Sequence, residues 1–440
     1  TTISPDLTRS TYDIPSSIGV FTDEKMKNMP RRGVVYALAP SNKNINTLWA
    51  GTDDGLVHIT RDGGMNWKDI TPSGVTSWSK ISQIDAGHFD DNTAYVAVNR
   101  IRCDDMKPHI YRTHDGGATW KEIVGGLPNE PINTVREDPM RKGLLYAGSE
   151  NAVYVSFDDG EHWQSLRQNM PCTSIRDLVV KDDDLVIGTH GRSFWIMDNI
   201  SSLRQINTSA QLSTNILFKP QKAVRVRWNM NPDTPLPPEE PAGQNPPDGA
   251  MIEFYLSEKA NSVELEIINQ NGKLVRKYSS NDTMYKIPDV NIPLYWIRPQ
   301  QLLSTNVGMQ RFLWDMHYQP LNEAPSYPIA AVKNNTAPDP TSPWAMPGMY
   351  TVRLKVNGQI QEQKMNVVMD PRVKTSLKDL QRQHDLSVIC YEGKKVTAGK
   401  NPQLFRKFNT LFDVVSSSDM APTSQTEKAI MQAQQELSKK

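Results

Sequence analysis

One eight-residue pattern occurs three times in the first half of the chain and limits its fold more than any other feature. Each copy reads Ser/Thr-x-Asp-x-Gly-x-x-Trp, at residues 60–67, 113–120 and 156–163. The Asp carboxylate can accept backbone N–H groups across a tight turn, and the Gly can adopt a positive φ. The Trp then buries a large ring beside the next repeat. The pattern therefore predicts a stapled hairpin and favours a structural role for its aspartates over a catalytic one.

The spacing of the copies predicts repeated four-stranded units. Successive pattern aspartates lie 53 and 43 residues apart, which is the period of a propeller blade. Strand-like runs recur in four sets, and the fourth set lacks the pattern. The sets are 34–38, 47–51, 56–60 and 67–70; 81–86, 94–98, 109–113 and 120–124; 132–136, 144–148, 152–156 and 163–166; and 175–180, 185–188, 193–197 and 203–206.

The repeated pattern resembles the Asp-box, or BNR, repeat of sialidases, sortilin-type receptors and two-propeller xyloglucanases. The resemblance implies β-propeller blades and says little about activity, because unrelated functions share this scaffold. It implies structural roles for the four fixed positions of the pattern in each of the three copies. These are Thr60, Asp62, Gly64 and Trp67; Thr113, Asp115, Gly117 and Trp120; and Ser156, Asp158, Gly160 and Trp163.

Residues 1–8 look like the last strand of a blade whose earlier strands are missing. A propeller has about four to eight blades, and an unclosed ring exposes strand edges. We therefore expect upstream blades on a companion polypeptide or a removed segment. The alternative is closure of the ring by residues 1–8, against which stands the outer strand predicted for the fourth blade at 203–206.

Loops between the second and third strands of the blades could form a site on one rim. Their carboxylates, Asp53, Asp54, Asp104, Asp105 and Glu150, are candidate catalytic residues, since glycoside hydrolysis uses paired carboxylates. Their cationic candidates for ligand binding are Arg100, Arg102, His190 and Arg192. Solvated loop charges are the alternative explanation for both sets.

The composition excludes several classes of function. Lys plus Arg equals Asp plus Glu at 49 each, so no electrostatic argument favours nucleic acid. No apolar run is long enough for a membrane span. The three cysteines, Cys103, Cys172 and Cys390, form no metal-ligand spacing and allow at most one disulfide. No cofactor motif or metal site is predicted.

The second half predicts a different architecture. After the propeller (1–210), residues 211–250 contain a strand-like run at 218–228 and a Pro-rich linker. Alternating runs from 251 to 372, with Asn-Gly turns at 271 and 357, predict an immunoglobulin- or fibronectin-like sandwich. Residues 373–440 show helical periodicity and form a predicted short helical tail.

Nearly the whole chain also looks like the C-terminal half of large bacterial secreted proteins labelled "glycosyl hydrolase, BNR repeat". The similar segments are 188–195, 228–232, 291–296 and 370–374. This resemblance implies further blades upstream and a secreted, periplasmic or cell-surface location. Two functions stay open: a glycan- or protein-binding and assembly module, or a glycoside hydrolase.

Overall fold

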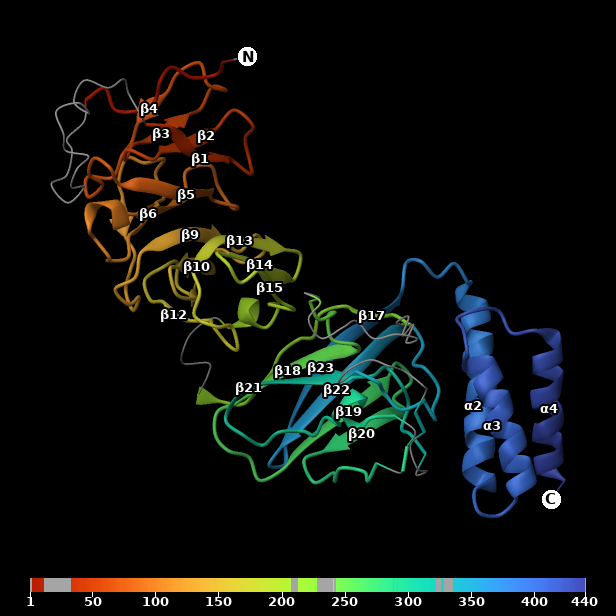
Figure 1. Ribbon diagram of the computed structural model, residues 1–440. Helices are drawn as coiled ribbons and strands as arrows, with labels where there is room; N and C mark the ends of the chain where they lie inside the picture. Colours follow the sequence, from red (N-terminus) through yellow and green to blue (C-terminus); the bar gives the residue numbers. More distant parts are fainter. Residues whose placement is uncertain are drawn as a thin grey trace. The chain divides into compact units, whose positions relative to one another are not determined.

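The computed structural model divides into two compact units, Thr1–Ser209 and Ala210–Lys440 (Figure 1). We describe each unit by itself. The structure describes residues 2–11, 33–206, 213–227, 240, 243–287, 289–290, 292–321, 326–327 and 335–439.

The first unit consists of four antiparallel sheets, each built from consecutive strands. Figure 1 shows the sheets following one another along the chain from β1 to β15. The first blade is β1 (Val35–Pro40), β2 (Leu48–Thr52), β3 (Val57–Thr60) and β4 (Lys68–Asp69). The second is β5 (Lys80–Ala86), β6 (Ala94–Asn99), β7 (Ile110–Thr113) and β8 (Lys121–Glu122). The third is β9 (Ile132–Glu137), β10 (Leu145–Ser149), β11 (Val153–Ser156) and β12 (Gln164–Ser165), and the fourth is β13 (Ile175–Lys181), β14 (Asp184–Thr189) and β15 (Phe194–Met197).

Apolar layers between successive sheets hold this unit together. Trp49 of the first blade is fully buried against Ile81 and Ile84 of the second, and it meets Trp120 edge to face at 6.4 Å. Tyr95 of the second blade lies in the equivalent layer before the third. Sheets packed face to face around their first strands are the blades of a β-propeller, so the predicted mainly β fold with a partial propeller is confirmed.

The outer edges of the blades differ from the prediction. The fourth strands are only two residues long where four or five were predicted. The predicted strand at 203–206 is wrong, because Leu203–Gln205 forms a 3₁₀ helix, η3. Arg204 explains the turn, since its guanidinium pairs at 2.9 Å with the buried Asp138 carboxylate and also with Asp183.

The second unit contains a two-sheet sandwich. One sheet has the order β16-β18-β21 and the other β17-β23-β22-β19-β20. Between them lies an apolar core that includes Trp314, Phe254 and Val352. The strands are β16 (Ile216–Leu217), β17 (Ala223–Arg225), β18 (Ala250–Leu256), β19 (Val263–Asn269), β20 (Leu274–Ser279), β21 (Gly308–Trp314), β22 (Gly348–Val356) and β23 (Gln359–Met369).

The strand-like run predicted at 218–228 is interrupted in the structure. β16 ends before it and pairs with β18, whereas β17 pairs in parallel with β23 in the other sheet. Residue 228 and most of the predicted Pro-rich linker lie outside the described residues.

The predicted helical tail forms three helices, α2 (Leu377–Thr397), α3 (Pro402–Ser416) and α4 (Ser424–Ser438). Side chains of Ser376, Asn401 and Thr423 cap their first turns, as N-cap residues do. The helices share an apolar core that includes Phe408 and Phe412. Within the described residues no helix combines the length and apolarity that a membrane span requires.

Candidate functional site

The turns of the three Ser/Thr-x-Asp-x-Gly-x-x-Trp copies, called Asp-box turns for their resemblance to that repeat, share one hydrogen-bond pattern. In the first, the Thr60 hydroxyl donates to Asp62 at 2.8 Å and accepts the Gly64 N–H at 3.0 Å. The Asp62 carboxylate also accepts the backbone N–H of Asn66 at 2.9 Å, and these bonds lower the pKa of Asp62 to about 2. The turns at Asp115 and Asp158 repeat the pattern. All three carboxylates therefore serve their own turns.

Each Asp-box Trp joins its blade to the outer segment of the preceding blade, so the prediction that its ring lies beside the next repeat is wrong. The indole N–H of Trp120 donates to the Ile70 carbonyl at 2.7 Å, and that of Trp163 to the Ile123 carbonyl at 2.9 Å. Trp67 makes the same bond, at 2.9 Å, to the carbonyl of Ile3. Residue 3 therefore occupies the place that Ile70 and Ile123 occupy at the next two junctions.

The two carboxylates in the rim loop of the first blade accept hydrogen bonds from the protein itself. The buried Asp54 carboxylate accepts the Thr52 hydroxyl at 2.5 Å and the Arg9 N–H at 2.8 Å. Asp53 accepts the N–H of Val34 at 2.8 Å. Both candidate carboxylates thus hold neighbouring backbone in place.

The longer loop of the second blade forms a charged cluster with the first. Arg102 pairs with Asp53 at 3.6 Å, and Arg100 pairs with Asp105 at 3.3 Å. Asp105 also meets His109 at 3.1 Å and accepts the Lys107 N–H at 3.0 Å. Partial burial opposes ionisation, but the Lys107 N–H, His109 and Arg100 together lower the pKa of Asp105. Asp104 is exposed and ends η2 (Ile101–Cys103) in the left-handed conformation.

The remaining rim candidates do not join that cluster through any contact seen among the described residues. Glu150 accepts from Asn133 at 3.0 Å and pairs with Arg176 at 3.3 Å. His190 and Arg192 are exposed in the β14–β15 loop. The structure therefore brings together Asp53 with Arg102 and Arg100 with Asp105, and it shows no contact between two candidate carboxylates.

A hollow of about 460 Å³ lies at the opposite ends of the strands, between the second and third blades. Its walls come from the turns that join first to second strands and from the Asp-box turns. The lining combines carboxylates, a lysine, an imidazole, an amide and an aromatic ring. The residues are Asp90, Asn92, Thr93, His114, Lys142, Gly143, Phe157, Asp158 and Asp159.

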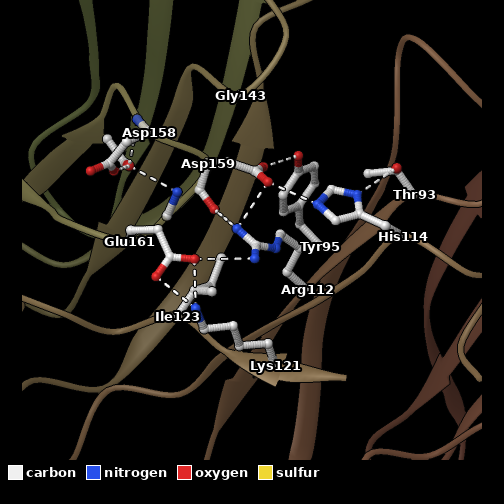
Figure 2. A network of polar contacts seen from close by, with 12 residues as sticks. Thr93, Tyr95, Arg112, His114, Lys121, Ile123, Gly143, Asp158, Asp159 and Glu161 are labelled. Carbon is white, nitrogen blue, oxygen red and sulfur yellow. Dashed lines mark hydrogen bonds and ion pairs between the residues drawn. The ribbon is translucent and has the colours of Figure 1, made fainter. Parts of the chain in front are cut away.

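Asp159 is the centre of a polar network beside this hollow, as Figure 2 shows. Its carboxylate accepts the Tyr95 hydroxyl at 2.6 Å, contacts His114 at 2.8 Å and pairs with Arg112 at 2.9 Å. Burial is the main reason that the pKa of Tyr95 is raised, and the nearby carboxylate of Glu137 adds to it. The network thus keeps Tyr95 a neutral donor, and the Arg112 guanidinium supplies a cationic partner for the Asp159 carboxylate.

Burial also raises the pKa of Glu137 behind this network, where its carboxylate accepts backbone N–H groups from His88 at 2.8 Å and Gly143 at 3.2 Å. Within the described residues no cluster of three or more His, Cys, Asp or Glu side chains could hold a metal ion. The carboxylates, the lysine and the amide that line the hollow can offer hydrogen bonds and charge to a polar ligand.

Sequence reasoning missed this hollow because it assigned the Asp-box side of the blades to structure alone. One signal was present. The third copy has Asp159 where the other copies have Gly63 and Gly116, and all three positions have a positive φ, of 62°, 72° and 72°. A carboxylate at a position that favours glycine marks a departure from the repeat.

No protein-family model matches the chain, and no curated protein matches it in sequence. Among solved structures, YCF48 bound to a D1 peptide is similar with 19% identity and a TM-score of 0.30, over 39% of this chain and 53% of that chain. A GH74 enzyme from Niastella koreensis has 16% identity and a TM-score of 0.30, over 35% and 26%. The GH74 xyloglucanase from Xanthomonas campestris has 13% identity and a TM-score of 0.30, over 49% and 32%. The chain thus spans about half or less of these structures, and the fold assignment rests on the blades described above.

Proposed function

We propose that this chain is an extracytoplasmic binding and assembly module whose blades complete a propeller ring together with a partner segment that carries further blades. The observation that carries the proposal is the exposure, at both ends of the blade series, of positions whose equivalents at the internal junctions are buried, with the one exception of the half-buried Arg112. The location outside the cytoplasm rests on the sequence resemblance alone.

At the leading end, Val35 and Leu38 of β1 are 46% and 59% exposed. The strand registers, each with a bulge after the first of these positions, give the equivalent residues in the other blades. These equivalents lie on the sheet face turned toward the preceding blade, and all are buried: Ile81, Ile132 and Ile175 for Val35, and Ile84, Val135 and Leu178 for Leu38. The first blade thus presents the surface that the others use against a preceding blade.

At the trailing end, Phe194 and Ile196 of β15 are 79% and 57% exposed. Their equivalents by register are Val57, Ile110 and Val153 for Phe194, all buried, and Ile59, Arg112 and Val155 for Ile196, of which Arg112 is half-buried and the other two are buried. Large apolar side chains on one sheet face are typical of an interaction surface. A following blade would cover them as it does at the internal junctions.

The segment 2–8 supports the same proposal. The Ile3 carbonyl accepts the Trp67 indole N–H, as outer-segment carbonyls do at the next two junctions. Residues 2–8 form no strand, which corrects the strand predicted there, but they lie where the outer strand of a preceding blade belongs. The fourth blade has no outer strand among the described residues, so the exposure of Leu38 and Phe194, and not a strand at 203–206, argues against closure of the ring by this segment. A partner would therefore supply the three inner strands of that blade.

Site-specific photo-crosslinking tests the assembly. Benzoylphenylalanine replaces Leu38 or Phe194 in a tagged chain made in the source cells, and the crosslinked peptides are sequenced by mass spectrometry. We expect both positions to capture peptides from a segment with Asp-box repeats, whereas the exposed Asp-box residue Met65 serves as a matched control. Crosslinks from none of these positions, together with a monomeric mass for the purified assembly, would refute the proposal.

The hollow favours a second candidate function, binding of a sugar-like polar ligand. Carboxylate and amide groups beside an aromatic ring suit such ligands because they combine orienting hydrogen bonds with an apolar contact. Lys142, which pairs with Asp90 at 3.5 Å across the hollow, is the most accessible of its charged groups. We therefore prefer binding to hydrolysis, because the rim carboxylates Asp53 and Asp54 accept backbone N–H groups and Asp105 pairs with Arg100.

Titration calorimetry with xylose, glucose, galactose and xyloglucan oligosaccharides tests this second function. Lys142→Ala is expected to weaken the binding of the responding sugar at least about tenfold, and Lys107→Ala on the rim loop is the matched control. Unchanged affinity in Lys142→Ala, or no heat from any of these sugars, would contradict binding in the hollow.

A further inference from the structure

We infer that the partner segment places an aliphatic side chain directly on Gly188 of β14, so that the junction after the fourth blade copies the internal ones. This inference rests on the proposed assembly function and specifies the chemistry of the partner at one end. It follows from what the small residues of the second strands do elsewhere in the unit.

Three second-strand positions are equivalent to Gly188 because each pairs with the first-strand residue after the bulge: Gly51, Ala97 and Gly148. A Cβ added to Gly51 would lie 2.3 Å from Cγ2 of Ile81, and one added to Gly148 would lie 2.5 Å from Cγ2 of Ile175. Ala97 shares a buried apolar cluster with Ile132. At each internal junction, an isoleucine of the next blade therefore sits on this small residue.

Gly188 has the same place in its blade and no such neighbour among the described residues. An added Cβ would find its nearest atom, the Asp177 carbonyl oxygen, at 3.6 Å and then Cε1 of Phe194 at 3.8 Å. Its φ lies outside the left-handed region, so the backbone does not require glycine. Glycine weakens a strand interior and often marks the close approach of another segment.

The surroundings of Gly188 define what the arriving side chain must be. Phe194 pairs with Gly188, and Ile196 and Val179 lie on the same face, all three exposed. An apolar knob seated among these side chains would remove them from water, with a favourable free energy of about 25 cal/mol per Å² of apolar area. The occupant is thus a first strand of a partner blade that carries an isoleucine- or valine-like residue at its bulge.

A graded substitution series tests the contact site formed by Gly188, Phe194, Ile196 and Val179, which we call the seat. Gly188→Ala adds only the methyl group that Ala97 already carries at an internal junction, and Gly188→Val fills the seat. The probe is the polypeptide that co-isolates with the wild-type chain from the source cells, separated from it and titrated back. We expect Gly188→Ala to weaken binding, because a Cβ on the equivalent Gly51 or Gly148 would lie 2.3 or 2.5 Å from the isoleucine of the next blade, and we expect Gly188→Val to weaken it further, by at least about tenfold.

Two controls distinguish loss of folding from loss of the seat. Gly148→Val is expected to lower the unfolding midpoint of the isolated chain, because its side chain would collide with Ile175. Gly188→Val is expected to leave that midpoint unchanged, and so is Gly243→Val, where nothing lies within 4 Å of an added Cβ.

The outcomes distinguish failure of the contact at Gly188 from failure of the proposed assembly. Equal binding by Gly188→Val and wild type would overturn the seat while leaving the assembly in place. If no companion polypeptide co-isolates, or if only a second copy of this chain associates, both the seat as assigned and the proposed partner fail.

Discussion

Replacing Gly160 by alanine tests whether adjacent blades really meet at the Asp-box glycine. Gly160 has a φ of 88°, and an added Cβ would lie 2.3 Å from Cδ1 of Ile123 in the preceding blade. The substitution therefore combines two costs. A left-handed backbone costs an alanine about 1–2 kcal/mol, and overpacking of a well-filled contact costs about 1–3 kcal/mol. We expect the free energy of unfolding to fall by about 2–5 kcal/mol.

Two further variants separate these costs. Gly191 has a φ of 83° and nothing within 4 Å of an added Cβ, so Gly191→Ala should show the backbone cost alone, about 1–2 kcal/mol. Ile123→Val removes the colliding Cδ1 and by itself costs about 0.5–1.5 kcal/mol. In the double variant with Gly160→Ala the closest contact is gone and the nearest remaining atom, Cβ of residue 123, lies at 3.0 Å, so the two effects should fall short of additivity by about 1 kcal/mol or more.

Urea unfolding followed by tryptophan fluorescence measures all four variants, because Trp163 lies beside the substituted position in the same turn. The reasoning is refuted if Gly160→Ala costs no more than Gly191→Ala. Strict additivity of Gly160→Ala and Ile123→Val would also refute it, since the two blades would then not be in contact at this point.

Three predictions concern the second unit. Arg225→Leu should cost about 3–5 kcal/mol in urea unfolding, because it breaks a 2.6 Å pair with the equally buried Asp419; a cost below 1 kcal/mol would contradict this. Burial lowers the pKa of His317 below its ordinary 6.5, so its contribution to stability is present above pH 6.5 and is lost as the pH falls further. The unfolding temperature should therefore be lower at pH 5 than at pH 7.5, and His317→Gln should reduce this difference in unfolding temperature. Burial raises the pKa of the Cys390 thiol to about 12, so a disulfide reagent at pH 8 should modify the exposed Cys172 far faster, and equal rates would count against the buried position.

The sequence was most informative where a local pattern carries its own geometry. The Asp-box predicts a turn because an acid, a glycine and a hydroxyl satisfy one another within five residues, without help from the rest of the chain. The alternating strands with Asn-Gly turns predict the sandwich hairpins, and β23 (Gln359–Met369) begins directly after the predicted turn at residue 357. The helix beginning at Pro402 follows from its Asn401 cap and its apolar stripe.

Prediction failed where a distant partner decides the local conformation. Residues 203–206 have the apolar ends of a short strand, but Arg204 is drawn to Asp138, a carboxylate 66 residues away that is buried and needs a cation. The sequence presents the rim carboxylates as catalytic candidates or solvated loop charges, yet Asp54 accepts the N–H of Arg9, from a segment 45 residues earlier. Neither contact has a periodicity or spacing that a single sequence reveals.

The two kinds of glycine in the blades show why the repeat also carries information about what lies beyond it. Gly64, Gly117 and Gly160 have positive φ values and would be glycine in any isolated hairpin of this type. Gly51, Gly148 and Gly188 do not, so their small size has to be explained by what lies against them. For the first two, that neighbour is an isoleucine of the next blade. Because Gly188 repeats the residue without the neighbour among the described residues, the same physical argument that explains the internal junctions points to a blade contributed by another segment.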